Sequence, residues 1–138
     1  MLVRVEMSEM LQLPADRPMR DPNAPLPPAS ASELVKEIGP EPGDLVVTKR
    51  QWGAFYATPL DQYLRRRGIK TIVLGGIATN IGVESTARAA VEHGYEVIFV
   101  EDAMSTLSAE AQQFAINFMF PILGRVRDTA TVIEALRR

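Results

Sequence analysis

The sequence predicts a three-layer α/β domain with a mainly parallel sheet. Short runs of apolar, partly β-branched residues recur along the chain, and segments with helical spacing separate them. The runs are apolar at successive positions, which is typical of strands that are covered on both faces. Strands that alternate with helices in this way form parallel sheets with helical crossovers. A chain of 138 residues is the size of one ordinary domain.

The first third of the chain predicts a strand, a long loop and a short helix. Residues 2–7 alternate apolar and charged side chains, as a strand does. Six of the ten prolines lie between Pro14 and Pro28, which excludes a helix interior or a central strand there. Residues 32–38 predict a short helix, with Ser32 as its N-cap and Gly39 at its end.

From residue 44 onward the elements alternate regularly. Apolar runs predict strands at 45–48, 71–74 and 96–100, and residues 125–127 predict a short edge strand. Helical spacing and end signals predict helices over 58–67, 80–93 and 108–119, the last ending before Pro121, and a final helix from an Asp128 cap to residue 136. Ligands bind beyond the carboxyl ends of parallel strands, so Thr48, Leu74 and Val100 indicate where a site would lie.

Composition excludes several classes of function. A net charge of −2 argues against a nucleic-acid partner, which would need a basic surplus. The absence of cysteine excludes disulfides, thiolate zinc sites and a thiol nucleophile. No apolar stretch approaches the ~20 residues of a membrane span. The start lacks the apolar region of a signal peptide, so we expect a cytoplasmic protein without membrane contact, metal or cofactor.

The glycine-rich segment at 75–88 is the strongest candidate for chemistry. It combines a strand end, a turn and a helix start, where unpaired backbone N–H groups and the helix dipole favour an oxyanion or carboxylate. Alternatively, the glycines only permit tight packing of the turn. The segment matches neither the dinucleotide-binding glycine pattern nor the phosphate-binding loop pattern, which weakens a nucleotide hypothesis.

The motifs of this segment closely resemble those of the isochorismatase-like hydrolases, also called the cysteine hydrolase superfamily. The resemblance covers Gly-Ile-Ala-Thr-Asn at 76–80, Glu-Ser-Thr-Ala-Arg at 84–88 and Glu-Asp-Ala at 101–103. It extends upstream to Thr-Lys-Arg-Gln-Trp-Gly-Ala-Phe at 48–55, which looks like the family's lysine loop. The resemblance implies a Rossmann-like, isochorismatase-like single domain over 1–138.

The resemblance also implies the site residues. It places a catalytic lysine at Lys49, and it places the family's nucleophilic cysteine at Gly82, which has no side chain. It implies a non-proline cis peptide bond at Ile77–Ala78, and substrate contacts are predicted from Trp52, Phe55, Ile77, Ala78, Thr79 and Asn80. The alternative for Trp52 is packing in an oligomer interface. Independently of the family, a lysine at a strand end beside two aromatic residues could be partly desolvated and used for proton transfer. The alternative is an ordinary surface lysine.

The family's catalytic aspartate has no counterpart in this sequence. It ends the family's first strand, whereas residues 2–7 match the family's second strand, so we expect the chain to lack the family's first strand and helix. Isochorismatases cleave a vinyl ether and do not depend on a thiol. The resemblance therefore predicts a hydrolase of a small, anionic metabolite without a thiol nucleophile. The alternative is an inactive member that serves as a small-molecule binder or an oligomeric scaffold.

Three further features carry smaller predictions. Phe114, Phe118, Met119 and Phe120 form an apolar patch at helical spacing, which indicates core packing or a contact in a homo-oligomer. Asp102 is expected to hold the turn that follows it. His93, the only histidine, is expected to lie in the last turn of its helix with a structural role.

Overall fold

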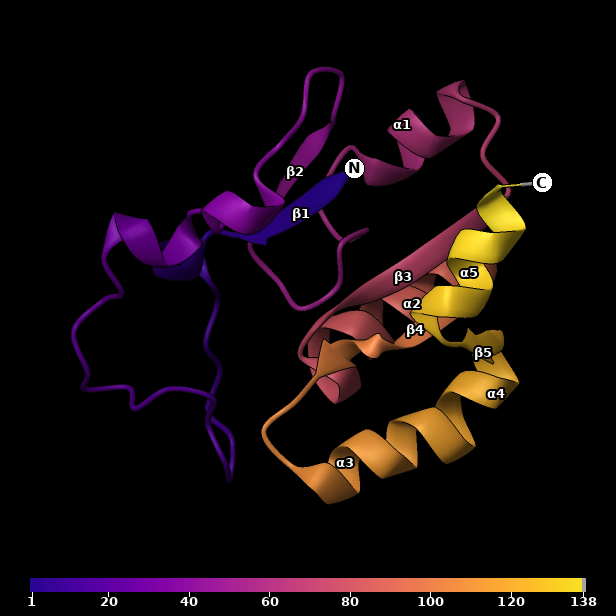
Figure 1. Cartoon of the computed structure of the whole chain (residues 1–138). Coiled ribbons are helices and arrows are strands. Elements are labelled where there is room, and N and C mark those ends of the chain that lie inside the picture. Colours follow the sequence, from indigo (N-terminus) through magenta and orange to yellow (C-terminus); the bar gives the residue numbers. More distant parts are fainter. Residues whose placement is uncertain (138) are drawn as a thin grey trace. The chain divides into compact units, whose positions relative to one another are not determined.

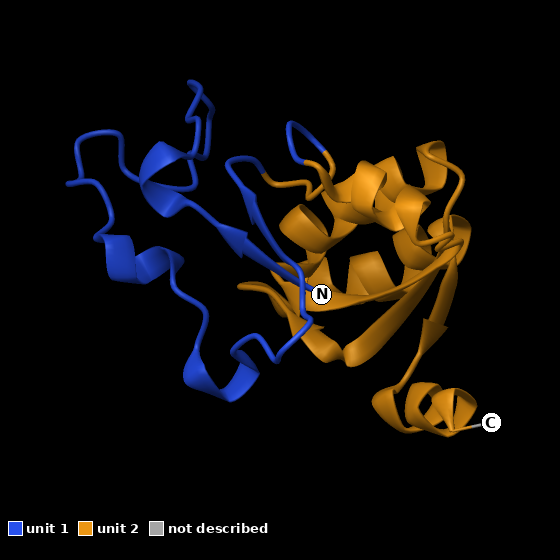
Figure 2. Ribbon diagram, turned by 90° about the horizontal axis from the view of Figure 1, so that it is seen from above, with its two compact units in different colours: residues 1–51, 56–58 blue, residues 52–55, 59–138 orange. Residues whose placement is uncertain are grey.

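The computed structural model describes residues 1–137, which form two compact units (Figures 1 and 2). Unit 1 contains residues 1–51 and 56–58, and unit 2 contains residues 52–55 and the described residues from 59 onward. The prediction of one domain over the whole chain stays a prediction. Each unit is described separately below.

Unit 1 contains a two-stranded parallel sheet. Strand β1 (Leu2–Val5) pairs with β2 (Val46–Lys49), and Val5 lies opposite Lys49. Backbone hydrogen bonds continue the ladder at both ends, from Leu2 N–H to the Leu45 carbonyl and from Glu6 N–H to the Lys49 carbonyl, each at 2.8 Å. Both predicted strands are confirmed, and their carboxyl ends lie at the same edge.

The segment between these strands has only short helical turns. They are η1 (Met7–Glu9), η2 (Ala29–Ser32) and η3 (Lys36–Ile38), and residues 10–28, all described, contain no helix or strand. The predicted proline-rich loop is confirmed, and the predicted helix at 32–38 is wrong. The Ser32 hydroxyl does not cap a helix, because it accepts the Met7 N–H at 2.9 Å and donates to Glu6 at 3.0 Å.

Unit 2 contains a three-stranded parallel sheet in the order β3–β4–β5. The strands are β3 (Thr71–Ile77), β4 (Glu96–Ser105) and β5 (Arg125–Arg127). The parallel sheet is confirmed, but β3 and β4 run past their predicted ends. A register shift between Leu74 and Gly76 lets β3 continue through its two glycines. A Cβ on Gly75 would lie 2.8 Å from the Ala103 carbonyl oxygen, so glycine allows the two strands to approach there.

Helices cover both faces of this sheet, which gives unit 2 the predicted three layers. Helices α2 (Glu84–Glu92) and α5 (Thr129–Leu136) both pack against β4, and they lie on opposite faces of the sheet (Figures 1 and 2). The remaining helical segments are α1 (Leu60–Arg66), η4 (Thr79–Val83), α3 (Ala109–Phe114), η5 (Ala115–Met119) and α4 (Phe120–Leu123). Among the described residues, no helix is long and apolar enough to span a membrane.

The helix predicted to end before Pro121 continues to Leu123. Segment η5 is a π-helical turn, and α4 follows it directly with the proline in its first turn. A proline is tolerated in the first turn of a helical segment, where its missing N–H removes no regular bond. The helix ends at Leu123 with Gly124 as its C-cap, and β5 begins at Arg125. Inside unit 2, the fully buried rings of Phe99 and Phe120 stack at 4.0 Å.

Two aspartates fix the start of α5. Asp128 accepts the Thr131 N–H at 2.7 Å, which confirms the predicted cap. Asp102 accepts the Thr129 N–H at 2.8 Å and the Thr129 hydroxyl at 2.7 Å. The prediction that Asp102 holds the turn next to it is therefore wrong. Asp102 holds a helix start 27 residues further along the chain.

A polar and aromatic cluster joins α1 to the end of α2 and the start of β4. The Tyr95 hydroxyl donates to Asp61 at 2.7 Å, Arg65 donates to Asp61 at 3.2 Å, and His93 lies 3.9 Å from the same carboxylate. Arg65 also donates to the His93 carbonyl at 2.6 Å. The Tyr95 hydrogen bond and then the positive charges of Arg65 and His93 lower the pKa of Asp61.

Asp61→Asn is expected to reduce the dependence of stability on acid pH. A carboxylate with a lowered folded-state pKa stabilises the fold above its ordinary pKa and loses that contribution as the pH falls through the folded-state value. The gap in unfolding free energy between wild type and Asp61→Asn is therefore expected to be complete above about pH 5 and to close at lower pH. Urea unfolding at a series of pH values measures it. Glu101→Gln, at an exposed carboxylate, is the control, and an equal gap at all pH values would contradict the prediction.

Candidate active site

Lys49 lies at the carboxyl end of β2 and is buried. Only 8% of the residue is exposed, although lysine is among the residues least often buried. Burial lowers the pKa of Lys49 because it disfavours the charged ammonium. Its backbone carbonyl accepts the Glu6 N–H, which fixes the strand end beneath the side chain. A buried lysine with a lowered pKa at this edge is suited to holding or transferring a proton.

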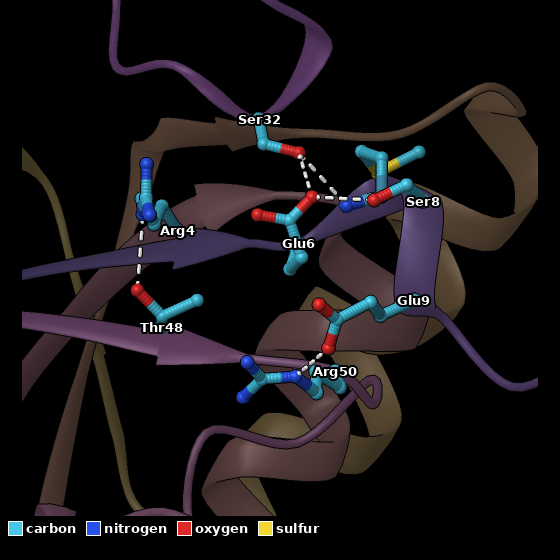
Figure 3. Close-up of polar contacts among 8 residues, drawn as sticks. Arg4, Glu6, Ser8, Glu9, Ser32, Thr48 and Arg50 are labelled. Atoms are coloured by element: carbon cyan, nitrogen blue, oxygen red, sulfur yellow. Dashed lines mark hydrogen bonds and ion pairs between the residues drawn. The ribbon is translucent and has the colours of Figure 1, made fainter. Parts of the chain in front are cut away.

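A single carboxylate with two hydroxyl partners lies just after the carboxyl end of β1 (Figure 3). Glu6 Oε1 accepts hydrogen bonds from the Ser8 hydroxyl at 2.8 Å and the Ser32 hydroxyl at 3.0 Å. These hydroxyls lower the pKa of Glu6, because they stabilise its charged form. The edge of the unit 1 sheet that carries Lys49 therefore also carries the Glu6 carboxylate, whose negative charge two hydroxyl groups stabilise.

Two contacts brace the same sheet from neighbouring positions (Figure 3). Arg50 forms an ion pair with Glu9, and Arg4 donates to the Thr48 hydroxyl at 3.0 Å. The Glu9 hydrogen bond and charge raise the pKa of Arg50. These pairs cannot be predicted from the sequence, because their members are 41 and 44 residues apart and no local pattern connects them.

In unit 2, the end of β3 leads into a helix start of unusual geometry. The Ile77–Ala78 peptide bond is cis, as the resemblance implied. The Ala78 carbonyl accepts the N–H groups of both Ile81 and Val83 at 3.1 Å, which forms the π-helical turn η4. Gly82 is buried inside this turn, and Ile77 is 80% exposed. The turn thus presents backbone rather than charged side chains at the carboxyl end of β3.

Thr79 and Asn80 differ in their surroundings. Thr79 is fully buried, and its hydroxyl has no hydrogen-bond partner among the described residues. Asn80 is exposed, and its Oδ1 accepts the Thr106 hydroxyl at 2.6 Å. Because Thr106 directly follows β4, this bond ties the helix start to the carboxyl end of the neighbouring strand. The two N–H donors of the Asn80 amide take no part in this bond.

Thr86 connects the turn at Gly82 to the segment at 52–55. Its hydroxyl donates to the Gly82 carbonyl at 2.7 Å and accepts the Ala54 N–H at 3.0 Å. The segment lies close to the helix at this point, because a Cβ on Gly53 would be 3.5 Å from the Ser85 carbonyl oxygen. Trp52 belongs to the same segment and is 48% exposed, and a substrate contact from it stays a prediction. The role of Thr86 is not evident from the sequence, because its partners lie 4 and 32 residues away.

Phe55 belongs to the same segment but contacts the other end of α2. Its ring is buried and lies 5.1 Å from the His93 ring and 5.8 Å from the Tyr95 ring, measured between centroids. These are packing contacts in unit 2, and a substrate contact from Phe55 stays a prediction. His93 follows α2 directly and joins the Asp61 cluster through its ring and its carbonyl.

The described residues contain no group of three or more His, Asp or Glu side chains that could hold a metal ion. The chemical groups at hand are a buried lysine in unit 1 and, in unit 2, a helix start with backbone amides and the amide of Asn80. Backbone N–H groups at a helix start can hold an oxyanion without a charged side chain.

Comparison with known proteins identifies a match over nearly the whole chain. The sequence model of the isochorismatase domain matches residues 2–131. The uncharacterized isochorismatase family protein YwoC of Bacillus subtilis (strain 168) is 57% identical over 110 residues, which cover 80% of this chain and 58% of YwoC. The corresponding protein YecD of Escherichia coli O157:H7 is 45% identical over 98% of this chain and 72% of YecD. This chain therefore spans 58% of the length of YwoC.

A solved structure agrees in fold as well as in sequence. An isochorismatase family protein from Burkholderia thailandensis superimposes with a TM-score of 0.89 and is 48% identical. The match covers 99% of this chain and 73% of that chain.

Proposed function

This chain belongs to the isochorismatase family, and from that membership we propose that it is a hydrolase of a small, anionic metabolite that works without a thiol nucleophile. The sequence contains no cysteine, so no thiol of this chain can attack a substrate, and the resemblance implies that Gly82 occupies the family's cysteine position. The proposal concerns the substrate site to which the residues of this chain contribute.

The observation that carries the proposal is the burial of Lys49. Keeping an ammonium group away from water is costly, and perturbed ionisable groups of this kind cluster at functional sites. We propose that Lys49 supplies positive charge or a proton to the substrate. As a separate proposal for unit 2, which the resemblance implies, the backbone from Ala78 to Gly82 holds negative charge on a substrate, with support from the helix dipole.

Vinyl ethers are the substrate class that best fits a chain with a buried lysine and no thiol. Hydrolysis of a vinyl ether begins with proton transfer to carbon and proceeds by addition of water, so it needs an acid but no covalent intermediate. Hydrolysis of an amide by this family's usual chemistry needs a thiol as nucleophile, which Gly82 does not supply. We therefore propose acid-assisted ether cleavage as the reaction type.

A hydrolysis screen tests the proposal directly. The purified chain is incubated with two panels, isochorismate-like vinyl ethers and small carboxamides, and products are measured by chromatography and mass spectrometry. We expect turnover in the ether panel and none in the amide panel. Amide turnover would contradict the reaction type, and saturable binding without turnover in either panel would support an inactive binder instead.

The proposed partners are a small-molecule substrate and further copies of the chain. Self-association is proposed because unit 2 exposes large apolar side chains on one helix, among them Phe118 at 64%. Of the predicted patch, Phe120 is buried in unit 2, and Phe114 and Phe118 are exposed.

A further inference from the structure

Lys49 differs in its surroundings from the other two lysines of the chain. Lys36 and Lys70 are exposed, whereas only 8% of Lys49 is exposed. A lysine usually brings its ammonium group to water by extending its flexible side chain along the protein surface. At Lys49 the fold keeps the residue almost entirely away from water.

The register of the unit 1 sheet places Lys49 on an apolar face. Val5 lies directly opposite Lys49 on the neighbouring strand. Val3 and Val47 lie one step earlier on the same face, because side chains two positions apart along a strand point the same way. Val47 is 1% exposed. Valine side chains offer an ammonium group no hydrogen-bond acceptor, and burial lowers the pKa of Lys49.

The charged side chains at this end of the sheet lie on its opposite face. Arg4 and Thr48 are paired there and bonded at 3.0 Å. Glu6, two positions after Arg4, continues that face, where two hydroxyl groups hold its carboxylate (Figure 3). The nearest carboxylate along β1 therefore points away from the Lys49 side chain and does not favour its charged form.

A desolvated lysine has a chemistry beyond proton transfer. In its neutral form the amine is a nucleophile, and lysines in apolar surroundings form Schiff bases with carbonyl compounds. Hydrolysis of a vinyl ether, the reaction proposed above, yields a carbonyl compound and an alcohol once water has added and the ether bond has broken. The proposed reaction therefore produces an electrophile beside the same amine.

We propose that Lys49 captures small carbonyl compounds, including the carbonyl product of ether cleavage, as a reversible imine. The nitrogen of the neutral amine bonds to the carbonyl carbon, the carbonyl oxygen leaves as water, and a C=N bond replaces the C=O bond. The step consumes no oxidant or reductant. It rests on the proposed function for the source of the carbonyl compound, whereas the reactivity of Lys49 does not depend on turnover.

Reductive trapping with pyruvate, a small anionic carbonyl compound, tests the proposal on the full chain. Cyanoborohydride converts an imine into a stable secondary amine, and peptide mapping by mass spectrometry compares the three lysines within one molecule. At neutral pH we expect Lys49 to react at least about tenfold faster than Lys36 and Lys70, because each unit by which a pKa is lowered raises the neutral fraction about tenfold. An adduct at the amino group of Met1 is mapped separately. In urea the preference for Lys49 is expected to disappear.

Two variants provide the matched comparison. Lys36→Arg is expected to keep the fast adduct, and Lys49→Arg is expected to lose it, with circular dichroism to verify that both fold. Equal rates at the three lysines of the folded chain, or a preference for Lys49 that survives in urea, would overturn the proposal. An adduct without ether turnover would count against the proposed function and leave this inference standing. Ether turnover without an adduct at Lys49 would overturn this inference alone.

Discussion

Gly124→Ala is expected to lower the free energy of unfolding by about 3 kcal/mol or more, at the upper end of overpacking substitutions. A Cβ at this position would overlap the Val97 carbonyl oxygen and would lie 3.0 Å from the Val97 carbonyl carbon and 3.2 Å from a ring carbon of Phe99. Backbone atoms of β4 cannot rotate away as a flexible side chain can. The Phe99 ring is also held, because it stacks on Phe120 in the fully buried core.

The cause of this effect is lack of space and not backbone conformation. Gly124 has extended backbone with φ of 178°, which any residue can adopt. Gly53→Ala is the matched control within unit 2, because its Cβ would meet only ordinary contacts at 3.5 Å or more. It is expected to change stability by no more than about 0.5 kcal/mol. Urea unfolding followed by circular dichroism, at one protein concentration for all variants, measures both, and equal midpoints for the two variants would contradict the expectation.

Gly124 also illustrates which parts of the fold could be predicted from the sequence. Apolar runs identified the strands, and local signals such as Asp128 identified helix starts correctly. The close approach of Gly124 to β4 was not predictable, because it depends on a residue 27 positions earlier. The long strands β3 and β4 were underestimated for the same reason. Pairing across the sheet carries β3 through two glycines that by themselves favour a turn.

Wrong predictions arose where a residue with a local preference had a distant partner. Ser32 has the chemistry of a helix cap, but its hydroxyl is used by Glu6 and the Met7 N–H. Asp102 was expected to bond locally and instead holds Thr129. Pro121 was expected to end a helix, but the preceding π-helical turn places it in a first turn. For Ser32 and Asp102, the distant contacts outweigh a local preference of about 1 kcal/mol.

In the candidate site, too, some features were indicated by the sequence and others became apparent only in the structure. Family motifs point to Lys49 and the turn at Gly82 as site residues, which stays a prediction, and the structure shows that Lys49 is buried. The Thr86 bridge and the bond from Thr106 to Asn80 hold the turn in place. Neither was predictable, because threonine and asparagine occur at many helix starts without such partners.

Lys49→Ala is expected to reduce the hydrolysis of a vinyl-ether substrate by about 10²- to 10⁴-fold, the range that a positioned acid or base contributes. The measurement is kcat/KM for the substrate that the screen identifies. Lys36→Ala, at an exposed lysine of the same unit, is the control and is expected to keep the wild-type rate. Equal rates for wild type and Lys49→Ala would remove Lys49 from the mechanism.

The pH dependence of Lys49 variants separates a role in chemistry from one in folding. Burial puts the pKa of Lys49 below its ordinary value of 10.5, so activity that needs the protonated lysine is expected to fall as the pH rises through that lowered value. In Lys49→Arg the guanidinium stays charged, and the alkaline decline is expected to disappear from whatever activity remains. Between the two pKa values the folded state binds fewer protons than the unfolded state, so the unfolding free energy of the wild type rises with pH. Lys49→Met is expected to lose this rise while remaining folded. A Lys49→Arg variant with the wild-type alkaline decline would show that another group controls the reaction.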